Sequence, residues 1–216
     1  IRALRRGLIK YDENHGYRGR EGQLNGTVFE ELDSLSRLFS QTKSIAPISL
    51  TVPEGLGERA LSGKRIVGGL HPGIVIYSGV ESALILMQDN QLYFLELKDS
   101  KWARQYIDVD TKGPVPKRFS EILSAGDLIR LKKGTDDQWL LSQEPEIQGA
   151  IVALDPSNGE IKALVGGFDF NQNQYNHAVQ SARQPGSGFK PFIYSAAIEN
   201  DINASQIFMD APLVFE

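Results

Sequence analysis

The sequence contains no cysteine, and that absence excludes several kinds of site. Without a thiol, the chain can have no disulfide scaffold, no cysteine nucleophile and no thiolate metal ligand. Histidine is also scarce, and none of the three histidines pairs with another at the spacing of a metal site. We therefore expect no metal ion and no cofactor.

Long apolar runs are missing too, and no segment is apolar enough over sufficient length to cross a bilayer. The N-terminus lacks the pattern of a signal peptide. No glycine-rich phosphate loop and no G-x-S-x-G motif occurs. A net charge of −4 and a pI of about 5.5 argue against nucleic acid as the main partner. Because the sequence begins at Ile1, we expect it to be part of a longer protein.

The length of 216 residues suggests one or two domains, and a hydrophobic share of 41% is enough for a sizeable core. Basic residues gather at the N-terminus, where residues 1–20 carry six Lys or Arg against two acidic residues. This segment is either the solvated face of a short helix or a surface that lies near an anionic partner.

Residues 1–64 are predicted to be an interdomain linker with helices. Apolar residues at helical spacing predict an amphipathic helix over residues 1–11 and another over residues 28–42. The polar, glycine-rich residues 12–27 separate these helices. Residues 44–71 hold two prolines and five glycines with little period, so we expect an extended loop there.

A β pattern fills residues 65–145. Runs of strand-forming residues between short turns predict three strands, then a small helix, then two further strands. The expected elements are strands at Gly73–Tyr77, Ser82–Met87 and Gln91–Glu96, a helix at Lys117–Leu123, and strands at Asp127–Lys132 and Gln138–Ser142. That order is typical of an OB-type barrel. We therefore predict an OB-like five-stranded β-barrel module, either a structural or protein-docking module or a binder of oligomeric ligands.

The last region, residues 146–216, begins with a predicted hairpin. Strands are expected at Gly149–Leu154 and Ile161–Gly166, because the five residues between them form a strong turn signal. A helical turn at Ala178–Arg183 should follow, and then a helix that begins at about Ser187. The predicted fold class is therefore α+β.

The most informative residues form the octapeptide Pro185–Phe192, which holds a serine three residues before a lysine. Residues three apart on a helix have Cβ atoms roughly 5–6 Å apart, so Lys190 can reach the Ser187 hydroxyl. A serine becomes nucleophilic when a base takes its proton, and a neutral lysine amine can be that base. Gly186 permits a tight entry turn. The apolar residues that the helix is predicted to bury are Phe189, Phe192, Ile193, Ala196 and Ala197.

The same S-x-x-K spacing occurs at Ser40–Lys43, where no glycine turn precedes it and no apolar helix follows. We interpret that copy as a solvated helix end. For Ser187, a helix N-terminus favours developing negative charge. From the residues alone two interpretations stay open: a nucleophile with Lys190 as its base, or a helix N-cap serine beside an exposed lysine.

Three stretches resemble the class A penicillin-binding proteins, which are bifunctional peptidoglycan synthases. Residues 149–170, GAIVALDPSNGEIKALVGGFDF, are similar to the opening hairpin of their transpeptidase domain. Residues 182–192, ARQPGSGFKPF, resemble the run into its nucleophile, for which S-x-x-K is the motif. Residues 11–19, YDENHGYRG, resemble the linker of the 1a subgroup of Gram-negative bacteria, which also carries an OB-type domain.

The resemblance implies a serine D,D-transpeptidase that cross-links peptidoglycan at the periplasmic face of the bacterial inner membrane, with the anchor outside this chain. Ser187 would form the acyl-enzyme with D-Ala-D-Ala stem peptides, and Lys190 would be its S-x-x-K lysine. β-Lactams would acylate the same serine. The resemblance also implies a glycosyltransferase in the parent protein and a lipid-linked precursor as a partner. A regulatory protein at the OB-like domain is a separate expectation for a protein-docking module.

Two positions depart from the family pattern, namely Gly188 where serine or threonine is frequent and His177 where arginine is common. The family's other catalytic motifs, S-x-N and K-T-G, occur nowhere in the sequence. We therefore expect a fragment with the nucleophile but an incomplete active site. Two other functions stay open: a serine β-lactamase or β-lactam sensor, and a non-catalytic OB-type module that recruits a cell-wall regulator.

Overall fold

The computed structural model describes residues 1–42 and 51–208, so Lys43 of the second S-x-x-K lies outside the described residues. The chain forms two compact units, Ile1–Gln180 and Ser181–Glu216. Within the described ranges, no helix combines the length and the apolarity needed to cross a membrane.

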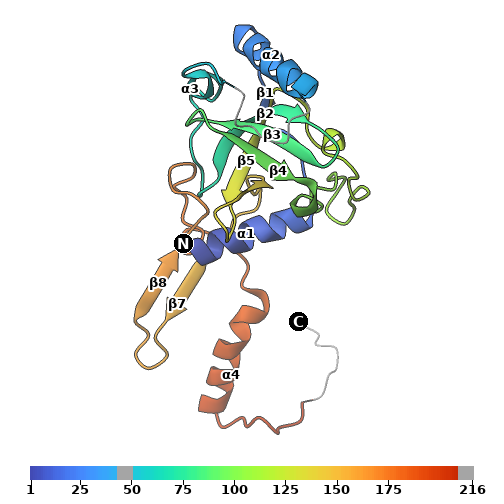
Figure 1. The fold of residues 1–216 in the computed structure, drawn as a ribbon. Helices are drawn as coiled ribbons and strands as arrows, with labels where there is room; N and C mark the ends of the chain where they lie inside the picture. Colours follow the sequence, from blue (N-terminus) through green and yellow to red (C-terminus); the bar gives the residue numbers. More distant parts are fainter. Residues whose placement is uncertain (43–50, 209–216) are drawn as a thin grey trace. The chain divides into compact units, whose positions relative to one another are not determined.

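The larger unit is built on an antiparallel sheet of six strands, shown in Figure 1. The strands are β1 (Gly22–Gln23), β2 (His71–Ser78), β3 (Ser82–Met87), β4 (Leu92–Glu96), β5 (Asp127–Lys133) and β6 (Trp139–Ser142). The pairing order is β1-β5-β2-β3-β4, with β6 also paired to β5. All five predicted strands are present. The sixth, β1, comes from the glycine-rich segment predicted as part of the linker, where two residues are too few to show a period.

The sheet is open, which corrects the prediction of a barrel. Among the described residues, β4 pairs only with β3 and β6 pairs only with β5, so no ladder joins these two edges. The rings of Tyr93 on β4 and Trp139 on β6 do meet edge to face, with centroids 6.0 Å apart. The sheet is therefore curled until its edges touch through side chains, without the hydrogen bonds that would close it.

Each face of the sheet carries its own apolar core, because side chains alternate between the two faces of a strand. One core contains Val75 and Ile85 and is covered by the segment around Phe119. The opposite core contains Ile74 and Leu84. It is covered by α2 (Thr27–Thr42) and α3 (Leu56–Ala60).

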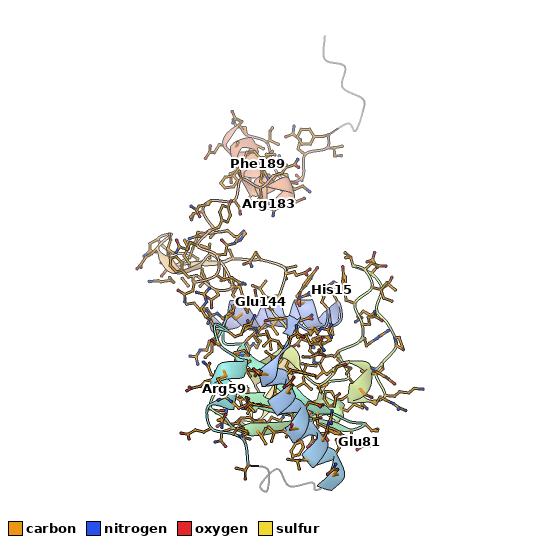
Figure 2. All side chains as sticks on the ribbon, turned by 90° about the horizontal axis from the view of Figure 1, so that it is seen from above. His15, Arg59, Glu81, Glu144, Arg183 and Phe189 are labelled. Atoms are coloured by element: carbon orange, nitrogen blue, oxygen red, sulfur yellow. The ribbon has the colours of Figure 1, made fainter. Side chains whose placement is uncertain are left out.

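The helices that cover the sheet differ in part from the prediction. An ion pair of 2.7 Å between Arg59 and Glu31 joins α3 to α2, and Figure 2 labels Arg59. α3 lies inside the predicted extended loop, which was wrong there because a five-residue helix is too short to show periodicity. The helix predicted at Lys117–Leu123 is only a 3-10 turn, η3 (Phe119–Glu121), and a second 3-10 turn, η2 (Leu97–Asp99), precedes it.

Helix α1 (Arg2–Asn14) runs along one side of the sheet, with a β-hairpin beside its first turn (Figure 1). It is longer than predicted because the polar residues Asp12 and Glu13 are also helical and buried. A third apolar cluster joins this helix to a turn before β2 and to the end of the hairpin. Its buried members are Leu4, Leu8, Ile9, Leu70 and Phe168.

The predicted hairpin is present as β7 (Ile151–Leu154) and β8 (Ile161–Val165). Its turn is closed by the Gly159 N–H, which donates to the Asp155 carbonyl at 2.8 Å. The apolar side chains of both strands are exposed, with exposed fractions of 37–57% for Ile151, Val152, Leu154, Ile161 and Leu164.

The smaller unit contains a 3-10 turn, η4 (Gly186–Phe189), that leads directly into α4 (Lys190–Glu199). Figure 2 labels Phe189 in this turn. None of the described residues covers the apolar side chains that α4 was predicted to bury, since Phe192 is 68% exposed and Ile193 53%. The helical turn predicted at Ala178–Arg183 lies earlier in the chain, because the Gln180 N–H donates to the Asn176 carbonyl at 2.9 Å and the turn ends at Gln180.

Candidate active site

Ser187 and Lys190 lie one turn apart where η4 becomes α4. The Lys190 N–H donates to the Ser187 carbonyl, which is the i to i+3 bond of a 3-10 turn. In such a turn the side chains of residues i and i+3 lie over one another. The local backbone therefore holds the hydroxyl and the amine on the same side of the helix start.

One glycine and two prolines determine where this helical segment begins. Gly186 has φ +53°, a left-handed conformation that glycine adopts without steric cost. The Gly188 N–H donates to the Pro185 carbonyl at 3.0 Å. Pro191 falls in the first turn of α4, where a missing N–H costs no helical hydrogen bond.

Both candidate side chains are exposed in the described chain. No hydrogen bond or ion pair joins either of them to another of the described residues. The described residues thus supply a hydroxyl and an amine on one turn, but not the burial and the neighbouring polar groups that a serine–lysine pair needs for acyl transfer.

The loop that precedes this unit is held tightly to the end of the hairpin. The His177 N–H donates to the Gly166 carbonyl at 2.8 Å, and a Cβ on Gly166 would lie only 2.1 Å from Asn176 Oδ1. The Tyr175 hydroxyl donates to the Gln180 carbonyl at 2.7 Å. A side chain at position 166 would therefore displace the loop that leads toward the serine.

A buried polar network at the C-terminal end of α1 was not predicted. Asp12 is 2.8 Å from the Arg18 guanidinium and accepts a hydrogen bond from Gln143 Nε2 at 2.7 Å. Glu13 pairs with Lys132 and accepts a hydrogen bond from the Ser142 hydroxyl. Two consecutive acidic residues at the end of a helix suggest a solvated surface, and only their distant partners explain their burial.

A polar groove of about 510 Å³ lies beside this network, between residues 18–21 and residues 143–146. Burial and the neighbouring carboxylate of Glu21 raise the pKa of Glu144, which Figure 2 labels and which accepts a hydrogen bond from Gln172. The groove holds no serine, and neither Ser187 nor Lys190 lines it. Among the described residues, no cluster of acidic and histidine side chains could hold a metal ion.

Two family models match consecutive parts of the chain. Residues 44–147 match the penicillin-binding protein OB-like domain, and residues 149–216 match the penicillin binding protein transpeptidase domain. The OB-like domain and the start of the transpeptidase domain predicted from the sequence are thereby confirmed.

Similar proteins cover nearly the whole chain. Penicillin-binding protein 1A of Pseudomonas aeruginosa is 37% identical over 99% of the chain, and that of Escherichia coli is 31% identical over 98%. The chain spans 23% and 22% of their lengths. The crystal structure of penicillin-binding protein 1A from Haemophilus influenzae matches 99% of this chain and 27% of its own, at 28% identity and a TM-score of 0.68. The chain therefore carries the OB-like domain and the start of the transpeptidase domain of penicillin-binding proteins, and it is similar to the 1A members over nearly its whole length.

Proposed function

We propose that this chain is part of a peptidoglycan synthase in which Ser187 is the nucleophile of a D,D-transpeptidase and Lys190 is its general base. The observation that carries the proposal is that Ser187 and Lys190 lie on one 3-10 turn at the start of α4, directly after Gly186 in its left-handed conformation. The stretch also lies within the residues that match the transpeptidase model. A serine β-lactamase or sensor is less well supported, because similarity to 1A proteins extends through the OB-like domain.

In the proposed reaction, the Ser187 hydroxyl attacks the carbonyl of the penultimate D-Ala while the Lys190 amine takes its proton. The terminal D-Ala then leaves, and an amine of a neighbouring strand accepts the acyl group. The Ser187 N–H is one donor to the developing oxyanion, because it lies in the first turn of the helical segment, beside the attacking hydroxyl. The second donor and the S-x-N and K-T-G partners must come from outside these 216 residues.

The substrate class follows from the same reaction. Stem peptides ending in D-Ala-D-Ala are the donors, and β-lactams acylate Ser187 as covalent inhibitors. The parent protein also carries a glycosyltransferase that uses a lipid-linked precursor, and it is anchored at the periplasmic face of the inner membrane. In this proposal the OB-like domain recruits a regulatory protein.

Labelling with a fluorescent penicillin tests the proposal in the full-length protein. We expect one label in the wild type and none in Ser187→Ala. Ser40→Ala is the matched control, since Ser40 has the same S-x-x-K spacing but donates its hydroxyl hydrogen to the Ser36 carbonyl at 2.8 Å within α2. Labelling that persists in Ser187→Ala would refute the assignment.

A further inference from the structure

The rest of the larger unit packs mainly against the end of the hairpin, and less against its strands. Except for Val165 at the end of β8, the strands β7 and β8 leave their apolar side chains exposed, whereas Phe168 and Asp169 are 1% and 9% exposed. These two residues follow the Gly166-Gly167 pair directly. The hairpin is therefore fastened at one end, where the chain turns toward the loop that precedes Ser187.

Phe168 supplies the apolar part of this fastening. Its ring lies in the cluster with Leu4 and Leu8 of α1. The ring also lies so close to Gly68 that a Cβ there would be 2.2 Å from Phe168 Cε1. The Phe168 carbonyl accepts a hydrogen bond of 2.8 Å from Arg5 Nε.

Asp169 supplies the polar part, and its side chain joins three separate segments. Its Oδ2 accepts a buried hydrogen bond of 2.6 Å from the Gly68 N–H and lies 3.5 Å from Arg5 Nη2. Its Oδ1 accepts the Asn171 N–H at 2.9 Å. One carboxylate thus links α1, the turn before β2, and the loop that follows the hairpin.

The loop that follows Asp169 is hydrogen-bonded to Asp169 at its start and to the hairpin near its end. The Asp169 carbonyl accepts the N–H of Asn173 at 3.0 Å, and the loop returns to the hairpin at Gly166. Because these hydrogen bonds hold the loop at both ends, we expect a shift of Asp169 to move the whole loop.

We propose that Asp169 is a positioning residue for acyl transfer, which sets the hairpin and its loop against α1 and the OB-like domain. It touches no reacting atom, and the inference rests on the proposed role of Ser187. A small misplacement far from the reacting atoms can lower a rate by about 10²-fold, because the reaction needs near-attack geometry. Removing the carboxylate also leaves the buried Gly68 N–H without its acceptor.

The test measures the acylation rate constant of the full-length protein at saturating penicillin, together with the melting temperature. We expect Asp169→Ala to lower the rate constant by about 10²-fold at temperatures where the protein is fully folded. Asp169→Asn keeps an acceptor oxygen for the Gly68 N–H but loses the charge that faces Arg5. Its acylation rate constant should therefore fall by less than that of Asp169→Ala. This variant also provides the measurement if the alanine variant does not fold. Asp155→Asn is the matched control at the opposite end of the hairpin, where the carboxylate accepts the Ser157 N–H at 2.9 Å, and it should leave the rate unchanged.

A purely structural role would lower the melting temperature and leave the rate of the folded protein within about twofold, and that result would overturn the proposal. Full recovery in Asp169→Asn together with a large loss in Asp169→Ala would support a role carried by the acceptor oxygen. Failure of the proposed function is distinguishable, because it would appear in the wild type as penicillin bound elsewhere than Ser187.

Discussion

Replacing Gly68 by alanine should destabilise the chain strongly, for two separable reasons. Gly68 has φ +60°, where an alanine costs about 1–2 kcal/mol. Its new Cβ would also lie 2.2 Å from Phe168 Cε1 and 2.4 Å from Cζ. The ring is 1% exposed and cannot swing into solvent, so this overpacking should add about 1–3 kcal/mol. We expect a total loss of about 2–5 kcal/mol in the free energy of unfolding.

Gly63 provides the control for this prediction. It has φ +72°, and a Cβ built there meets no atom within 4 Å. Gly63→Ala should therefore show only the backbone cost. The assay is urea unfolding of the chain, monitored by tryptophan fluorescence, for both variants. In a Phe168→Leu background the cost of Gly68→Ala should fall, since the atoms that clash most are absent. Equal losses for Gly68→Ala and Gly63→Ala would refute the close packing described for Phe168.

Three further variants test other parts of the account. Leu32→Ala should cost about 2–5 kcal/mol in urea unfolding, because Leu32 is 2% exposed on the buried face of α2. Leu38→Ala, on the same helix at a position 52% exposed, should cost less than about 0.5 kcal/mol. Glu144→Gln should raise the free energy of unfolding at pH 7. Folding raises the pKa of the Glu144 carboxyl, so the wild-type protein loses stability as the pH rises above the ordinary pKa of a glutamate, about 4.3. The gain should stay below about 1 kcal/mol in a partly solvated site and vanish at pH 3, and a Tm difference that does not change with pH would contradict this cause. Lys190→Arg should acylate as slowly as Lys190→Ala, at least about 10²-fold below wild type, because a guanidinium does not give up its proton. Near-wild-type acylation of the arginine variant would remove Lys190 as the base.

The strands were predictable where a run of apolar residues is bounded by turn signals. The observed bounds of β3, Ser82–Met87, are the predicted ones. The position of the β7–β8 hairpin was predicted from its turn residues, Asp155–Gly159. Elements too short to show a period, such as β1 and α3, were not predictable. Periodicity showed that α4 has apolar side chains, but it could not show which surface would cover them.

The buried polar contacts could not be predicted from the sequence for a different reason. Arg5 and Asp169 are 164 residues apart, and Asp12 and Gln143 are 131 apart. No local pattern marks such pairs. The S-x-x-K motif could be recognised because its residues are neighbours on one turn, so that spacing alone determines their proximity.

Mass spectrometry of the penicillin-treated full-length protein shows directly whether Ser187 is the nucleophile. After proteolysis, we expect a single adduct, on the peptide that contains Ser187, with fragment ions that place the added mass on that serine. The peptide containing Ser40 should keep its unmodified mass in the same sample. An adduct on any other residue, or an unmodified Ser187 in a protein that has bound penicillin covalently, would contradict the account.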